Sequence, residues 1–219
     1  MSSSHGGPVV GVPYAENKTL RVLVWVYVMV WVVAAISPLD RQTWLLENGL
    51  VFAAAAGLVA THRRFVFSNV SYALIFAFFV LHAVGAHYTY SAVPVGDWVR
   101  DWADLERNHY DRVVHFAYGL LLAYPMREIG LRVVHIHGVA SYVAPPALVL
   151  STSSMYEIIE SWAARIGDPS VGMAYVGAQG DVWDGQKDMT LALVGSILAM
   201  VLAAMVRRTS GREPYLASG

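Results

Sequence analysis

The stretch MTLALVGSILAMVLAAMV, residues 189–206, runs for eighteen residues without a charged side chain. An α-helix rises about 1.5 Å per residue, so a helix of this length extends over roughly 27 Å. The hydrocarbon core of a bilayer is roughly 30 Å thick. The stretch therefore predicts a membrane-spanning helix.

Five further apolar runs precede this stretch. They are Leu20–Ile36, Leu50–Ala60 with an extension back toward Trp44, Val70–Ala86, Val113–Tyr124 and Val139–Met155. Of the 219 residues, 56% are hydrophobic and 14% are charged, which leaves too little polar surface to cover a water-soluble globule of this size. We expect an all-α, polytopic integral membrane protein with about six transmembrane helices, embedded in a lipid bilayer.

The expected organisation is a disordered cytoplasmic tail at 1–18, a single six-helix membrane domain at 19–208 and a second cytoplasmic tail at 209–219. Lys18 and Arg21 precede the first apolar run as in a secretory signal. That run is longer than a usual signal core and carries two tryptophans, so an uncleaved helix is favoured. Cysteine is absent, so any metal would need oxygen and imidazole ligands.

The distribution of basic residues predicts the orientation, because cytoplasmic loops carry an excess of Lys and Arg. Nine lie on the side of the two termini: Lys18, Arg21, Arg63, Arg64, Arg127, Arg132, Arg207, Arg208 and Arg212. Six lie on the other side: Arg41, Arg100, Arg107, Arg112, Arg165 and Lys187. We expect a multi-pass protein of the cytoplasmic (inner) membrane with both termini in the cytoplasm. Its outer face is expected to be strongly acidic.

Two long outer loops differ in pattern. Within residues 91–110, Trp98, Trp102 and Leu105 recur at helical spacing among Asp and Arg residues. This predicts a short amphipathic helix that lies on the membrane surface. Residues 161–180 contain several glycines and a proline, which predicts an irregular segment that covers or gates what lies beneath it.

A group of ionisable or phenolic residues lies at helix ends that open on the outer side. Its eleven members are His82, His87, Tyr88, Tyr90, Asp111, His115, Glu157, Glu160, Asp181, Asp184 and Asp188. Charged groups at the edge of the hydrocarbon are energetically unfavourable and typically mark functional sites. Their convergence predicts an outward-facing site that binds a cation or carries out proton chemistry.

Asp111 and His115 are four residues apart, so they share one helix face. A carboxylate beside an imidazole orients the ring and favours its protonated form, which suits a general base and equally a metal site. In the alternative interpretation, Asn108 caps the helix, Asp111 interacts with the helix dipole and His115 packs between helices.

Glu157 and Glu160 are three residues apart near the outer end of the fifth run. Two carboxylates this close repel each other unless a proton or a cation lies between them. Acidic groups are also unfavourable at a helix C-terminus. Glu160 has the alternative of reaching water, whereas Glu157 is expected to act with Asp111 and His115 as a catalytic residue.

The segment DVWDGQKDM, residues 181–189, places three aspartates on one face if the last helix begins at Asp181. With the preceding residues, the candidate metal ligands are His115, Glu157, Glu160, Asp181, Asp184 and Asp188. Oxygen ligands suit Mg²⁺, Mn²⁺ or Ca²⁺, and imidazole shifts the preference toward Mn²⁺, Fe²⁺ or Zn²⁺. The alternative is helix capping by Asp181 or Asp188. Gly185 weakens the helix there, or allows close approach of a neighbouring helix or a ligand.

The tyrosines and histidines at the end of the third run are expected to have mainly structural roles. Tyr88 and Tyr90 are expected in an interfacial aromatic belt. His82 and His87 are five residues apart, so at most one of them is expected to join the site. Glu128 lies at the cytoplasmic end of the fourth run and is expected to pair locally with Arg127 or Arg132.

Four segments together resemble the YjdF-like inner-membrane proteins, a family of unknown function. They are HAVGAHYTY (82–90), DRVVHFAYGLLLAYPMRE (111–128), SSMYEIIESWAA (153–164) and GAQGDVWDGQKDM (177–189). The resemblance implies a small polytopic protein of the cytoplasmic membrane and implies no reaction. The order of Asp-His, Glu and Asp along successive helices is more distantly similar to VanZ-like membrane proteins.

The leading functional hypothesis is a metal-dependent membrane enzyme that acts on a lipid-linked or amphiphilic substrate at the outer leaflet, with no nucleic-acid partner. The alternatives are a transporter of ions or small solutes, and a structural or partner-binding membrane protein whose carboxylates cap helices. No GxSxG or HExxH motif of established hydrolases is present. The lack of an inverted repeat counts against a transporter.

Overall fold

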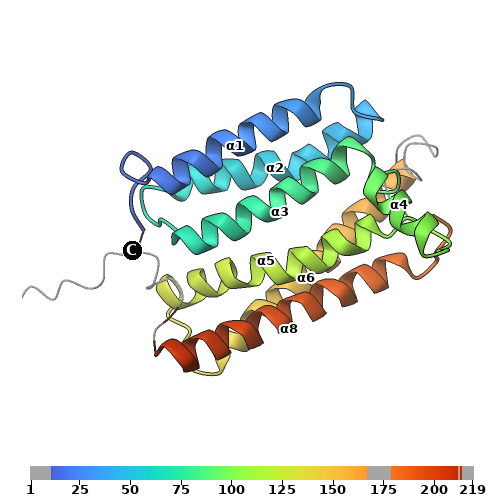
Figure 1. The fold of residues 1–219 in the computed structure, drawn as a ribbon. Helices are drawn as coiled ribbons and strands as arrows, with labels where there is room; N and C mark the ends of the chain where they lie inside the picture. Colours follow the sequence, from blue (N-terminus) through green and yellow to red (C-terminus); the bar gives the residue numbers. More distant parts are fainter. Residues whose placement is uncertain (1–10, 167–178, 212, 214–219) are drawn as a thin grey trace, which may run out of the picture.

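The computed structural model describes residues 11–166, 179–211 and 213, and this part of the chain contains helices and no strand (Figure 1). The helices are α1 (Lys18–Ala35), α2 (Arg41–Thr61), α3 (Asn69–His87), α4 (Pro94–Trp102), α5 (Tyr110–Arg132), α6 (Ala140–Ile166) and α8 (Asp184–Ser210). The predicted all-α class is confirmed.

Four of these helices are long and apolar enough to cross a membrane: α1, α2, α3 and α8. Their exposed surfaces are rich in large apolar side chains, which would be unfavourable in water and suit contact with lipid. The chain is therefore an integral membrane protein. Helices α5 and α6 have 23 and 27 residues and lie alongside the other four, but they carry more polar groups (Figure 1). Their assignment as further spans stays a prediction.

The long helices form two groups (Figure 1). Helices α1, α2 and α3 pack together in one group, α5, α6 and α8 in the other, and contact between α3 and α5 joins them. We call the end of the bundle where α4 lies the site end, and the other the opposite end. Helices α5 and α8 both begin at the site end, so they run parallel.

Polar side chains define the starts of three helices. Asn17 accepts a hydrogen bond from the backbone N–H of Leu20 at 2.9 Å, and Asp40 accepts one from Thr43 at 2.6 Å. Ser68 does the same for α3. Such caps satisfy N–H groups that have no partner within the helix. The Asn17 amide also donates to Asn69 Oδ1 at 2.7 Å, which fixes the start of α1 beside the start of α3.

The closest helix contact joins α5 to α8. A Cβ atom on Gly119 would collide with the carbonyl oxygen of Ala192, and one on Gly195 would collide with the carbonyl oxygen of Phe116. Both glycines therefore allow the two backbones to touch. Small residues at helix interfaces are typical of membrane proteins, where close packing replaces the hydrophobic effect as the source of association.

A buried polar network holds the opposite end together. Glu128 is fully buried and accepts hydrogen bonds from the Ser68 backbone N–H at 2.9 Å, from the Ser68 hydroxyl at 2.8 Å and from the Ser71 hydroxyl at 2.5 Å. It also pairs with Arg132, as expected from the sequence. Every oxygen of this carboxylate thus faces a donor, as a buried charge requires. Nearby, the buried Arg127 pairs with Glu213 at 2.7 Å.

Three expectations about helix boundaries need correction. The expected short amphipathic helix exists as α4, with Trp98 and Trp102 exposed, but it ends at Trp102 and excludes Leu105, and its position on the membrane surface stays a prediction. Helix α6 continues to Ile166, so the start of the 161–180 loop is helical, while residues 167–178 lie outside the described part. Helix α8 begins at Asp184, so Asp181 precedes it. Residues 1–10 of the predicted tail at 1–18 lie outside the part of the chain that the structure describes, so the tail stays a prediction.

Alanine at Gly119 or Gly195 should destabilise the protein. The added methyl group must push two backbones apart, and overpacking of this kind costs about 1–3 kcal/mol. Gly57→Ala is the matched control, because nothing lies within 4 Å of the position of its Cβ. Thermal unfolding in detergent, followed by circular dichroism, should show lower midpoints for the first two variants. Midpoints equal to that of Gly57→Ala would contradict the close contact.

Candidate functional site

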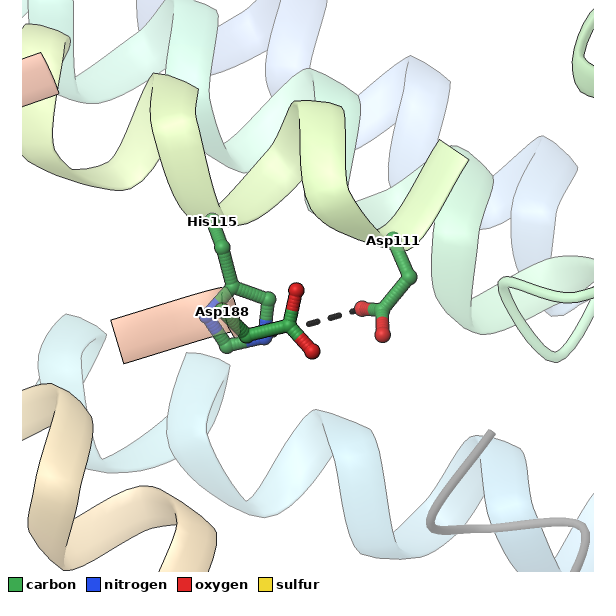
Figure 2. Close-up of side chains that lie close together, drawn as sticks. All are labelled: Asp111, His115 and Asp188. Carbon is green, nitrogen blue, oxygen red and sulfur yellow. Dashed lines mark ion pairs between the residues drawn. The ribbon is translucent and has the colours of Figure 1, made fainter. Parts of the chain in front are cut away.

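Three of the sequence-predicted residues meet at the site end. Asp111 and His115 lie one turn apart on α5, and Asp188 reaches toward them from α8 (Figure 2). One potential ligand atom from each lies within 4.8 Å of the others. The geometry follows from the parallel contact of the two helices: Gly119 touches Ala192, and one turn earlier on each helix are His115 and Asp188.

His115 Nε2 lies 3.6 Å from Asp111 Oδ1, the pair joined by the dashed line in Figure 2, and 3.7 Å from Glu157 Oε1 on α6. Both separations are too long for good hydrogen bonds. Two ligands that each lie about 2.1 Å from one ion are separated by roughly 3 to 3.5 Å. The His115–Asp111 and His115–Glu157 distances are close to this range, whereas the group of Asp111, His115 and Asp188, within 4.8 Å, would have to contract to hold one ion.

Two buried carboxylate oxygens at this site have no hydrogen-bond partner: Asp188 Oδ1 and Glu157 Oε1. The Asp188 side chain belongs to a residue only 2% exposed. Unpaired buried carboxylate oxygens are energetically unfavourable and rare, so each requires an explanation. A bound cation, or protons shared between the carboxylates, would satisfy these oxygens and reduce the repulsion between the neighbouring acids.

Gly185 brings Glu157 to this place. A Cβ on Gly185 would lie 2.6 Å from Glu157 Oε2, so a larger residue would displace the carboxylate. Of the alternatives for Gly185, the close approach is the one observed, and the approaching group is the Glu157 side chain of α6, while α8 is continuous through Gly185. The start of α8 therefore packs against a carboxylate of α6 as well as against α5.

Asp181 and Asp184 face arginines. Asp184 Oδ1 lies 2.5 Å from Arg107 Nη1, and Asp181 Oδ2 lies 2.5 Å from both Arg112 Nη2 and Lys187 Nζ. Arg112 Nη2 also lies 3.3 Å from Asp184 Oδ1, which links the two pairs. These ion pairs tie the start of α8 to the start of α5. The metal-binding role expected for the two aspartates stays a prediction.

Asn108 fixes the loop before α5. It is fully buried, its amide donates to the Val93 carbonyl and to Asp97 Oδ1, each at 3.0 Å, and its side-chain oxygen accepts from the Tyr110 backbone N–H at 3.0 Å. The expected capping role is therefore confirmed in part, although the residue directly before the helix is His109. This anchoring positions Asp111 within the first turn of α5.

A second polar group lies beside the first and includes a residue that the sequence did not single out. Glu47 on α2 is 2% exposed and accepts a hydrogen bond from the Tyr156 hydroxyl at 2.9 Å. His82 Nε2 lies 3.2 Å from the Glu47 carbonyl oxygen, and its Nδ1 lies 2.6 Å from the Tyr90 hydroxyl. The sequence offered one signal for the role of Glu47, namely a charged residue beside the apolar run of the second helix.

These positions settle two expectations. The assignment of Tyr90 to an interfacial belt is wrong, because its ring is buried and its hydroxyl bonds to His82. One histidine of the pair, His82, lies in the site region, whereas His87 bonds to the Ala34 carbonyl at 2.9 Å and ties α3 to the end of α1. A half-buried Tyr88 packs against His87.

A cavity of about 320 Å³ connects the two polar groups. Its polar lining comprises Glu47, His82, Tyr90, Asp111, His115, Tyr118, Thr152, Ser153, Tyr156 and Glu160. The alternative that Glu160 reaches water is wrong, because the residue is only 8% exposed and lines the cavity. Catalytic and ligand sites are typically concave and combine apolar walls with a few convergent polar groups.

Comparison with known proteins agrees with this architecture. A family model described as "Predicted membrane protein (DUF2238)" matches residues 19–209. The chain belongs to this family. It is also 39% identical over 182 residues to the inner membrane protein YjdF of Escherichia coli (strain K12), an alignment that covers 80% of this chain and 84% of that protein. The expected relation to YjdF-like proteins is confirmed, and the likeness to VanZ-like proteins stays a prediction. No solved structure matches the chain.

The Asp181 ion pairs should make stability depend on pH at the acidic end. Hydrogen bonds from Lys187 and from the Trp183 backbone N–H, with Arg112, lower the pKa of Asp181 from 3.8 to about 2. The unfolded state therefore binds more protons between these values, so the contribution is complete above pH 3.8 and is lost as the pH falls toward about 2.

Thermal unfolding of wild type and Asp181→Asn across this range measures the effect. The midpoints should differ above pH 3.8 and converge below it. Asp101→Asn, at a position on the exposed face of α4, is the control and should show little difference at any pH. A difference between wild type and Asp181→Asn that does not vary with pH would contradict the ion-pair origin.

Proposed function

We propose that this chain is a membrane enzyme whose Asp111, His115 and Asp188 bind a divalent cation. Mg²⁺, Mn²⁺ and Zn²⁺ are the candidates, because the ligands are two carboxylates and an imidazole. The substrate would be a lipid-linked or otherwise amphiphilic molecule, since the adjoining cavity has both apolar and polar walls. Membership of the family does not by itself imply a reaction, so the enzymatic activity is proposed from the geometry of the site.

The observation that carries the proposal is the contrast between the two ends of the bundle. At the opposite end, the buried Glu128 has donors for both of its oxygens. At the site end, Asp188 and Glu157 each keep a buried oxygen without a donor. A purely structural role would favour the first arrangement, because unsatisfied buried carboxylates destabilise a fold. The second arrangement is typical of a site that binds a ligand.

The residues of the site divide the chemical roles between them. A divalent cation held there would supply Lewis acidity and lower the pKa of a coordinated water. Glu157 would accept a proton, a role supported by its Oε1, which lies 3.7 Å from His115 Nε2 and has no hydrogen-bond partner. Asp111 and His115 would bind the cation together, since Asp111 Oδ1 lies 3.6 Å from His115 Nε2. Glu160 lines the neighbouring cavity, where it would contact the substrate.

The orientation of the site belongs to the same proposal. The matched relative is an inner membrane protein, and the count of nine basic residues against six favours a cytoplasmic location for both termini of this chain. Helix α1 begins and helix α8 ends at the opposite end (Figure 1). The site end would then face outward, so the substrate would be reached from the outer leaflet.

An enzyme is favoured over a transporter by the packing behind the site. One turn beyond His115 and Asp188, the backbones of α5 and α8 touch at Gly119, and they touch again at Gly195. This contact closes the α5–α8 interface toward the opposite end. A transporter that used this interface would need to separate the two helices, whereas an enzyme open at one end would not.

Metal content tests the proposal. Detergent-purified protein, incubated with Mg²⁺, Mn²⁺ and Zn²⁺ and then desalted, should carry about one ion per chain by elemental mass spectrometry. Asp188→Asn and His115→Ala should each lower this content at least tenfold, because each removes a ligand. Asp101→Asn is the matched control and should retain the ion, since Asp101 lies on the exposed face of α4.

Circular dichroism of the same samples separates loss of metal from loss of fold. Folded Asp188→Asn protein that lacks the ion supports the proposed site. If the wild-type protein carries no metal after all three incubations, the hypothesis of a metal-dependent enzyme is wrong. Metal-free proton chemistry would then be the remaining catalytic hypothesis.

A further inference from the structure

The cavity beside the candidate metal site has two kinds of wall. Its polar lining includes carboxylates and histidines, and the three carboxylates, Glu47, Asp111 and Glu160, come from three different helices. Apolar side chains line the rest, among them the buried Phe78 and Val114. Such a chamber suits a molecule with a polar head and an aliphatic tail.

The chamber opens sideways, toward the surrounding membrane. Three of its apolar lining residues are well exposed on the molecular surface: Leu50 on α2 at 43%, and Met155 and Ile159 on α6 at 62% and 51%. Helix α2 packs mainly on α3, and the Tyr156–Glu47 hydrogen bond bridges the space between α6 and α2. An aliphatic chain can therefore enter between α2 and α6 without crossing water.

One buried hydroxyl in the chamber wall lacks a partner. Ser153 is 3% exposed, lines the cavity, and its Oγ makes no hydrogen bond. A buried hydroxyl without a partner is energetically unfavourable unless a ligand supplies one. This observation is independent of the carboxylates, and a ligand in the chamber would give the hydroxyl a partner that the described residues do not supply.

The charge of the wall limits the head group. The described residues that line the chamber include three carboxylates and neither lysine nor arginine. Without a bound cation, a phosphate or carboxylate head would find no cationic side chain among these residues to balance its charge, and an unpaired buried charge is energetically unfavourable. A hydroxyl or an ammonium group would instead donate hydrogen bonds to Glu47, Glu160 or Ser153.

We infer that the chamber binds a single-chain amphiphile whose head group donates hydrogen bonds, a hydroxyl or an ammonium, and that this molecule enters from the bilayer between α2 and α6. The inference rests on the proposed function, because it names the substrate class of the same site. The volume of about 320 Å³ is at the small end for ligand sites and suits one chain rather than a two-chain phospholipid.

Photochemical capture tests this inference without an activity assay. A phenylalanine analogue with a photoreactive azide is placed at Phe78, in the chamber wall, or at Phe67 as the matched control. Phe67 is also buried, but it packs against Phe65 and Tyr72 near the opposite end. The full-length protein in phosphatidylcholine vesicles is irradiated with dodecanol, dodecylamine or dodecyl phosphate, and adducts are quantified by mass spectrometry.

At Phe78 we expect adducts of dodecanol or dodecylamine at least five times more abundant than those of dodecyl phosphate, and only background labelling at Phe67. Glu47→Gln distinguishes the two donor heads: it should lower capture of the amine severalfold if ammonium is preferred, and should leave capture of the alcohol nearly unchanged. Equal capture of all three compounds would overturn recognition of the head group. No capture at Phe78, or equal capture at Phe67, would overturn entry into the chamber.

The capture is repeated in the presence of a chelator. Adducts that persist in the presence of the chelator support binding of the amphiphile in the chamber, even if the metal-content experiment finds no metal. The two proposals can therefore fail separately. Loss of selectivity for the donor heads with the chelator would overturn their recognition by the chamber's own side chains.

Discussion

The backbone contact between α5 and α8 is the constraint on which the site depends. Gly119 and Gly195 let two parallel helices touch, and this fixes their register as well as their distance. Because the helices run in the same direction, one turn back from Gly119 and Ala192 brings His115 opposite Asp188. A side chain at either glycine would widen the interface and separate the groups that form the site.

The fold uses buried acids in two different ways. Glu128 stabilises the opposite end, because serine hydroxyls, a backbone N–H and Arg132 surround it. Asp181 and Asp184 likewise pair with basic residues and hold the start of α8 against α5. Asp188 and Glu157 receive no such compensation. The distinction between structural and functional carboxylates therefore lies in the donors around them, since the sequence pattern led us to expect all of them near helix ends.

Much of the site could be predicted from spacing. Asp111 and His115 share a helix face by their separation of four residues, and the helix they occupy places them together without help from tertiary contacts. Glu47 and Tyr90 could not be found in the same way. Their roles depend on which face of α2 turns inward and on how the chain folds back after α3, and neither follows from the local sequence.

The sequence by itself determined the membrane class, the helical architecture and the gathering of acidic and histidine residues toward one end. These follow from the length and polarity of each segment, which are local properties. The tertiary structure alone decided which acids meet arginines, which remain unsatisfied, and where the chamber opens. Those outcomes depend on the rotation and register of packed helices, set by contacts between glycines and carbonyl groups far apart along the chain.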